Sequence, residues 1–234
     1  MAQKHTPEIV LPTAEHHHTI IFLHGRGSTA AEFHPELFES QASDGRYLPD
    51  IFPHAKWLFP TSGMMLNRFG DVESQWFDMW TTENPHERFE EQKTALNEAV
   101  ARIKAQIAEE AALVGGAQNV VLAGISQGCA VAVAAMLCQG ERIGGFVGLS
   151  SWFPKVVAGV MPGVEVVKTP VFVGHCQDDS VIEIKYGEGL RDHLEGLGME
   201  VQWQSYPDGG HWVNEPEGID DMVKFIHEAL KNLT

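Results

Sequence analysis

Several short runs in this sequence are apolar throughout and lack the alternation of polar and apolar residues that marks a half-exposed strand. They lie at residues 19–23, 56–59, 119–124, 145–149 and 170–174. A strand that is apolar along its length has both faces covered, as in a parallel sheet between layers of helices. A sixth run, residues 201–206, does alternate and is expected nearer an edge of the sheet.

Segments with helical periodicity separate these runs. In residues 87–114, apolar side chains recur at spacings of three and four, which places them on one face of a helix. Residues 127–137 are small and apolar and predict a buried helix. Further helices are expected at residues 184–197 and from Glu215 or Glu217 to Leu233. Strands that alternate with helices predict an α/β fold, with a mostly parallel sheet flanked by helices on both faces.

The chain has the length and composition of one globular domain. It has 234 residues, of which 44% are hydrophobic, and it shows no internal repeat, low-complexity tract or linker. We expect residues 1–18 to be an N-terminal extension and residues 19–234 to form a single domain.

The charge and the cysteines argue against several classes of function. With 16 basic and 32 acidic residues the net charge is −16, which disfavours binding to nucleic acid or to an anionic membrane surface. No apolar run approaches the roughly 18 residues of a membrane span, so no membrane insertion is expected. Cys129, Cys138 and Cys176 lack the spacing of a zinc site or of a disulfide framework. We therefore expect a cytoplasmic protein that holds no metal ion.

A candidate nucleophile lies in the pattern Gly-x-Ser-x-Gly at residues 124–128. The pattern alone is weak, but here an apolar run precedes it and the segment of small residues follows it. That order of strand, turn and helix is the one that a nucleophile elbow requires, with glycines where side chains would collide. We therefore predict Ser126 as a nucleophile. The alternative is a tight glycine-rich turn with an incidental serine.

A nucleophilic serine needs a histidine base and an acid that orients the base, and in this fold class they follow the serine in the order acid, then histidine. Asp178 and Asp179 come after the run at residues 170–174, and either could be this acid. Both could instead be loop or helix-cap residues. His211 follows the run at residues 201–206 after two glycines, which distinguishes it among the 12 histidines.

Acyl transfer also needs backbone N–H groups that stabilise an oxyanion. Residues 23–28, Leu-His-Gly-Arg-Gly-Ser, follow the first strand, and their two glycines let the loop lie close to a substrate. The expected donors are the N–H groups of Arg26 and of Gln127, the residue after the serine. The loop lacks the sequence ending of a phosphate-binding loop.

Together these motifs resemble the acyl-protein thioesterase family, also called the phospholipase/carboxylesterase family, of the α/β-hydrolases. The likeness runs from about Thr19 to Leu230 and includes Gln-Trp-Phe-Asp at residues 75–78 and Leu-Ser-Ser-Trp-Phe-Pro at residues 149–154. The resemblance implies an α/β-hydrolase fold. It also implies a cytosolic serine hydrolase, a monomer or weak homodimer, that cleaves thioesters or oxygen esters of acyl chains without metal or cofactor.

The resemblance also bears on the acid. In the family the acid is followed by two residues and then valine, and in this chain that register falls on Asp178, before Val181. The resemblance therefore favours Asp178 over Asp179.

An acyl chain would need an apolar groove. Six residues are candidates for its lining, although all could be ordinary core or loop residues: Met64, Met65, Leu66, Trp76, Phe77 and Trp152. Arg26 and Trp212 stand where the family commonly has an apolar and a small residue. We expect them to narrow the site or to favour a polar or anionic part of the substrate, unless they only fill space at the rim.

Three functions are consistent with these residues. The first is a serine hydrolase that acts on acyl thioesters or esters, with a small ester or an acylated protein as substrate. The second is a general carboxylesterase or lysophospholipase with the same chemistry. The third is a hydrolase fold used as a binding module without turnover, which a missing catalytic residue would favour.

Overall fold

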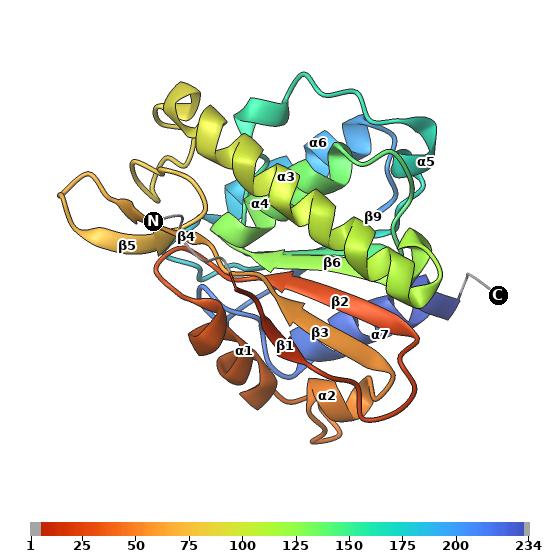
Figure 1. The fold of residues 1–234 in the computed structure, drawn as a ribbon. Helices are drawn as coiled ribbons and strands as arrows, with labels where there is room; N and C mark the ends of the chain where they lie inside the picture. Colours follow the sequence, from red (N-terminus) through yellow and green to blue (C-terminus); the bar gives the residue numbers. More distant parts are fainter. Residues whose placement is uncertain (1–5, 232–234) are drawn as a thin grey trace.

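The computed structural model describes residues 6–231. A seven-stranded sheet in the order β1-β3-β2-β6-β7-β8-β9 forms the centre of the molecule (Figure 1). Its strands are β1 (Glu8–Val10), β2 (His18–Leu23), β3 (Ala55–Phe59), β6 (Val120–Ile125), β7 (Gly145–Leu149), β8 (Val171–Cys176) and β9 (Val201–Tyr206). Only β1 runs antiparallel to its neighbour. The carboxyl ends of the other six strands therefore share one edge of the sheet.

Helices cover both faces of the sheet (Figure 1). One layer holds α3 (Phe89–Val114), α4 (Gln127–Leu137) and α6 (Ile184–Gly196), and the other holds α1 (Ala30–Glu39), α2 (Leu48–Ile51) and α7 (Glu217–Lys231). Short helical turns are α5 (Val164–Val167), η1 (Ala117–Asn119) and η2 (Lys155–Val157). The predicted α/β architecture is confirmed, and β9 lies at the edge as its alternation predicts.

Strand β2 shows why the apolar runs do not alternate. Ile21 and Leu23 pack with residues of α3 and α4, whereas Ile20 and Phe22 face the opposite layer and pack with residues of α1. Successive side chains of a strand point to opposite faces, so a strand covered on both sides is apolar at every position.

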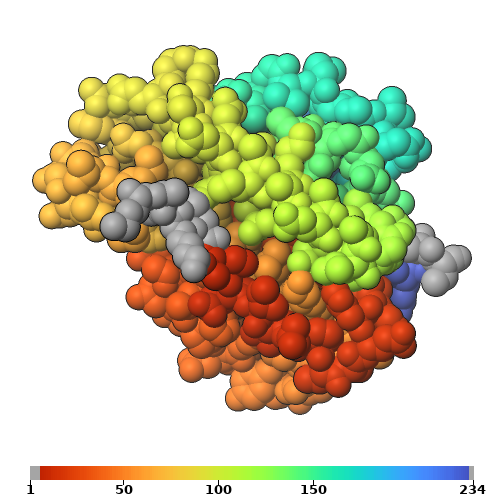
Figure 2. All heavy atoms as spheres, viewed as in Figure 1, coloured from red at the N-terminus to blue at the C-terminus, as the bar shows by residue number. Residues whose placement is uncertain are grey.

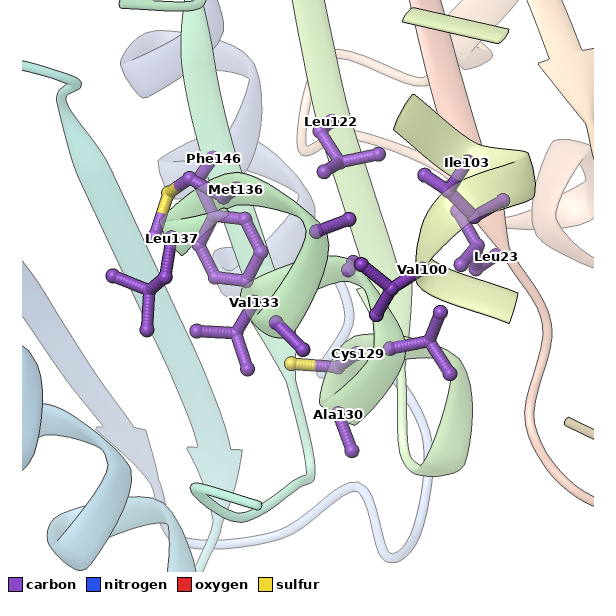
Figure 3. Packing of buried hydrophobic residues seen from close by; sticks show 14 of the residues in the cluster. Leu23, Val100, Ile103, Leu122, Cys129, Ala130, Val133, Met136, Leu137 and Phe146 are labelled. Carbon is purple, nitrogen blue, oxygen red and sulfur yellow. The ribbon is translucent and has the colours of Figure 1, made fainter. Parts of the chain in front are cut away.

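The small residues of α4 let that helix lie between the sheet and α3. Cys129, Ala130 and Val133 are fully buried and, in Figure 3, lie near Val100 of α3 and Leu122 of β6. Larger side chains in α4 would push the two elements apart, because protein interiors are close-packed. The predicted buried helix is confirmed, and its first residue is fixed next to Ser126.

Three features differ from the sequence expectations. Strand β1 pairs with β3, with Ile9 opposite Leu58, so part of the expected extension at residues 1–18 belongs to the sheet. A second sheet, the hairpin of β4 (Gly63–Leu66) and β5 (Val72–Gln75), was not foreseen, and it projects from the body of the molecule (Figures 1 and 2). The expected end of the last helix at Leu233 lies outside the described residues.

Within residues 6–231, no helix is both long enough and apolar enough to cross a membrane.

The turn between β6 and α4 gives a test of the fold. An alanine Cβ at position 128 would lie 2.3 Å from the carbonyl oxygen of His24 and 2.5 Å from that of Leu23, both backbone atoms. We expect Gly128→Ala to lower the free energy of unfolding by about 1–3 kcal/mol, the usual range for overpacking. The measurement is urea unfolding. Gly140→Ala is the control, because no atom lies within 4 Å of a Cβ there. Equal stability of the two variants would contradict the close crossing.

Candidate active site

Ser126 occupies the sharp turn between β6 and α4. Its backbone has φ 54° and ψ −125°, a positive φ that residues other than glycine adopt only when their surroundings enforce it. Its N–H donates to the carbonyl of Leu149 at 2.9 Å, and its own carbonyl accepts from the hydroxyl of Ser151 at 2.7 Å. The order of strand, turn and helix that the sequence predicts is present, and β7 and the residues after it hold the serine in place.

A buried carboxylate contacts His211, and it belongs to Asp179. Nδ1 of His211 lies 2.8 Å from Oδ2 of Asp179, which is only 5% exposed. Asp178 is exposed, and its Oδ1 accepts from the N–H of Gly210 at 2.8 Å. The preference for Asp178 that the family resemblance gave is therefore wrong, because the carboxylate in contact with His211 is that of Asp179. Asp178 fixes the glycine turn before the histidine instead of contacting the ring.

The register with Val181 misled the sequence prediction. The chain continues with Ile182, so a short gap followed by a β-branched residue fits either aspartate. What separates them is burial. The side chain of Ile182 is fully buried, and its N–H and that of Val181 each donate to Oδ1 of Asp179 at 2.9 Å. Because Asp179 accepts hydrogen bonds from these two N–H groups, its side chain points into the protein, whereas Asp178 faces solvent.

The electrostatics favour an ionised Asp179. Burial opposes ionisation, but the interactions with His175 and His211 outweigh burial and hold the pKa of the Asp179 carboxyl below its usual range. An ionised carboxylate only accepts hydrogen bonds, so the short contact assigns a proton to Nδ1 of His211. The lone pair on Nε2 of a neutral His211 is then available as a base.

Ser126 and His211 follow strands of the same parallel sheet and therefore belong to the same edge. Within the described part of the chain, no hydrogen bond joins the Ser126 hydroxyl to His211. Their contact stays a prediction. Such bonds are often long in a free enzyme and tighten when substrate binds.

The loop after β2 passes beside the serine. A Cβ on Gly25 would lie 3.4 Å from Cβ and 3.9 Å from Oγ of Ser126, so the backbone of this loop passes within van der Waals distance of the serine. Arg26 is the next residue. Gln127 is the first residue of α4, and the first N–H groups of a helix have no acceptor within the helix. Gln127 therefore directly follows the serine, and Arg26 belongs to the loop that passes beside it. Their role as oxyanion donors stays a prediction.

The side chain of Arg26 is already paired. Its Nε donates to Oε1 of Glu73 at 2.7 Å, and a terminal nitrogen contacts the same oxygen. The N–H of Gly27 donates to the carbonyl of Ser74 at 2.8 Å. These contacts tie the loop to β5. The expectation that Arg26 favours an anionic part of a substrate does not fit this pairing, because its charge is balanced within the protein.

The side chain of Gln127 has a role that the sequence did not reveal. Its Oε1 accepts from the N–H of Trp76, and its Nε2 donates to the carbonyl of Phe77, each at 2.8 Å. The indole N–H of Trp76 in turn donates to the carbonyl of His24 at 2.8 Å. A polar residue in a buried apolar helix needs such partners, which is the signal that could have pointed to this network.

His24 is buried within the same network. Its Nδ1 lies 2.8 Å from the carbonyl oxygen of Gly25, and its Nε2 accepts from the N–H of Ser62 at 3.2 Å. Burial lowers the pKa of His24 to about 4, and the bond to Gly25 offsets this only in part. The ring is therefore neutral, and it connects the loop after β2 to the residue before β4.

The six residues predicted to line an acyl groove do not line a common surface. Trp76, Phe77 and Trp152 are 2%, 0% and 1% exposed and belong to the core. Met64 and Leu66 are exposed on the hairpin, and Met65 lines a cleft of about 420 Å³ that also contains Trp76 and Arg102.

Trp212 packs against the body of the protein. Its ring centroid lies 5.8 Å from that of Phe33 in α1, and its indole N–H points to the hydroxyl of Ser40 at 3.4 Å. These contacts favour the alternative in which Trp212 fills space at the rim. Among residues 6–231, no group of three or more His, Cys, Asp or Glu side chains is arranged to hold a metal ion.

The fold and the turn at Ser126 define an α/β-hydrolase. The model of the phospholipase/carboxylesterase family matches residues 4–230 of this sequence, so the chain belongs to that family, whose members are hydrolases that act on esters. The resemblance seen in the motifs is confirmed.

Individual relatives agree with this assignment. The chain is 30% identical over 230 residues to acyl-protein thioesterase 1 of Yarrowia lipolytica, a match that covers 96% of this chain and 98% of the relative. It is 31% identical over 217 residues to a rice protein (Oryza sativa subsp. japonica) named a probable inactive carboxylesterase, with coverage of 90% and 84%. The crystal structure of SOBER1 from Arabidopsis thaliana matches with a TM-score of 0.76 at 25% identity, and covers 91% of this chain and 99% of that chain.

The buried His24 predicts how stability depends on pH. Because its pKa is about 4 in the folded protein and near 6.5 when unfolded, the unfolded chain binds more protons below pH 6.5 and stability falls as the pH falls. Between pH 7.5 and 5.5, His24 should account for a loss of about 1 kcal/mol. Urea unfolding across this range should show a loss that is about 1 kcal/mol smaller in His24→Gln than in the native protein. Parallel curves would contradict the assignment.

Proposed function

We propose that this protein is a serine esterase that hydrolyses acyl thioesters or carboxylic esters through an acyl-enzyme intermediate. The observation that carries the proposal is the contact of 2.8 Å between His211 and the buried carboxylate of Asp179. It lies at the sheet edge where the turn after β6 presents Ser126. A nucleophile, a base and an orienting acid are the three groups that this chemistry needs.

In the proposed cycle, Nε2 of His211 takes the proton of the Ser126 hydroxyl while the oxygen attacks the acyl carbonyl. The N–H groups of Arg26 and Gln127 stabilise the oxyanion, which is worth about 3 kcal/mol per donor in known sites. His211 then protonates the leaving thiol or alcohol. Asp179 holds the proton on Nδ1 and stabilises the positive charge of the ring. A water molecule activated by His211 repeats the attack and releases the acid.

The substrate class follows from the relatives and from the rim of the site. The proteins named acyl-protein thioesterase 1 support an acyl thioester, either in an acylated protein or in a small molecule. The exposed Met64 and Leu66, together with Met65, lie on a hairpin tied to the loop after β2, and we propose that they contact the acyl chain. The alternative is a general carboxylesterase or lysophospholipase. The relatives named carboxylesterases support a carboxylesterase.

Location and assembly belong to the same proposal. The three cysteines are free, which fits a cytoplasmic protein. The family resemblance favours a monomer or weak homodimer, with no resident metal or cofactor.

A binding module without turnover remains the alternative from a different class. The rice relative named a probable inactive carboxylesterase gives a reason to test it. This chain has the serine, the acid and the histidine in the order that the fold class requires, and the acid is paired with the histidine, which favours turnover.

The nucleophile is tested by Ser126→Ala. We expect the native protein to react with a fluorophosphonate at Ser126 and to hydrolyse acyl thioesters and oxygen esters in a series of graded chain lengths. Ser126→Ala should lose both the labelling and at least about 10³-fold in kcat/KM, because its attacking oxygen is removed. A preference for long thioesters would support the acyl thioesterase. Turnover that persists in the variant would contradict the proposal.

The acid is tested by a matched pair of neighbours. Asp179→Asn should lower kcat by about 10³–10⁴-fold, because the amide no longer holds the ring of His211 in the required tautomer. Asp178→Asn keeps an acceptor for the N–H of Gly210 and should lower kcat by less than about tenfold. Steady-state kinetics on one ester compare the two. A larger loss in Asp178→Asn would restore the assignment made from sequence.

A further inference from the structure

A second histidine, which the proposed cycle does not use, lies behind the acid. His175 is in β8, one residue before the end of the strand, and its side chain is fully buried. Its ring is separated from solvent, so it cannot touch a substrate at the rim. Buried polar side chains are usually held by specific partners, and the partners of His175 point to its role.

The partners of His175 are the acid and the turn that holds the acid. Its Nε2 lies 2.8 Å from the carbonyl oxygen of Ile182 and 3.3 Å from Oδ2 of Asp179. A carbonyl oxygen only accepts, so the proton of the ring is on Nε2 and is shared between the two oxygens. The N–H of Ile182 donates to Oδ1 of Asp179 at 2.9 Å. The three residues thus form a closed ring of contacts around the carboxylate.

The ring of His175 is also fixed from the opposite side. A Cβ on Gly187 of α6 would lie 2.3 Å from Nδ1 of His175 and 3.1 Å from the ring of Trp203. The helix can approach this closely only because residue 187 is glycine. Nδ1 has no hydrogen-bond partner among the residues that the structure describes, so its orientation is set by the Nε2 contacts and by packing.

We infer that His175 is a positioning residue for the proposed reaction: its Nε2–H holds Oδ2 of Asp179 at the point where that oxygen receives Nδ1 of His211. The inference rests on the proposed function and deepens it. Two imidazoles meet the same carboxylate oxygen, one at 2.8 Å from the reaction side and one at 3.3 Å from the core. The N–H groups of Val181 and Ile182 hold Oδ1, so removing the core donor leaves His211 as the remaining hydrogen-bond partner of Oδ2 and lets that oxygen turn away from the ring.

Two substitutions of His175 separate positioning from packing. His175→Leu fills the space of the ring with an apolar side chain and removes the N–H donor. His175→Gln can place an N–H near the position of Nε2. Activity is measured as kcat for each active site titrated to completion with a fluorophosphonate, so that unfolded protein does not count. We expect kcat to fall about tenfold or more in His175→Leu with KM unchanged, and to recover to within about threefold of native in His175→Gln.

A second pair reaches the ring without changing His175. Gly187→Ala should displace the imidazole and lower kcat about tenfold, while Gly189→Ala, in the same helix with no atom within 4 Å of its Cβ, should keep kcat within about twofold of native. If His175→Leu does not fold, this pair decides. The inference would be overturned if His175→Leu and Gly187→Ala both kept the native kcat per titrated site and lost only thermal stability. Undiminished turnover in Ser126→Ala would instead overturn the proposed function.

Discussion

The crossing of α4 over the ends of β2 and β6 is the constraint on which the rest of the site depends. No side chain fits at position 124 or 128, where a Cβ would lie less than 3 Å from backbone atoms. The tight crossing keeps Ser126 in an uncommon backbone conformation at the end of a strand. It also places Gln127 where its amide can hold the backbone of Trp76 and Phe77. One steric requirement thereby positions a hydroxyl, a helix N-terminus and the segment beside them.

From this crossing, hydrogen bonds extend to the neighbouring loops. Trp76 connects to His24 through its indole N–H, His24 connects to Ser62, and Arg26 pairs with Glu73 of the hairpin. The ion pair of Arg26 is partly buried, so its two charges are less screened than a pair on the surface. The loop predicted to supply an oxyanion donor is therefore braced on two sides. Such bracing is what a preorganised site needs, because its donors must not reorganise during the reaction.

The sequence predicts the architecture well because that architecture follows from local patterns. Runs that are apolar on both faces predict the covered parallel strands, and the glycines at 124 and 128, between such a run and a helix of small residues, predict the sharp turn at Ser126. The acid was placed one residue off, because Val181 and Ile182 fit the same pattern and only tertiary burial distinguishes Asp179 from Asp178. Strand β1 was missed because a three-residue edge strand has too little periodicity to detect.

The six candidate groove residues divide into core and surface residues, a division that the sequence did not predict. Aromatic and methionine residues are typical both of acyl pockets and of cores, and sequence does not tell which surface they face. Trp76 and Trp152 are buried in the core, while Met64 and Leu66 stand on a hairpin that the sequence did not predict. Most polar partners of Gln127, His24 and His175 could likewise not be predicted, because they lie far away in the sequence or across a turn whose shape the sequence does not determine.

The most direct measurement of the central claim is a crystal structure of the protein after reaction with a fluorophosphonate. The account predicts phosphorus bonded to Oγ of Ser126 and a phosphonyl oxygen about 2.7–3.1 Å from the backbone nitrogens of Arg26 and Gln127. It also predicts Nε2 of His211 within hydrogen-bond reach of the serine oxygen, with Asp179 still on Nδ1. A phosphonylated serine with His211 far from it, or with the phosphonyl oxygen turned away from both amides, would contradict the account.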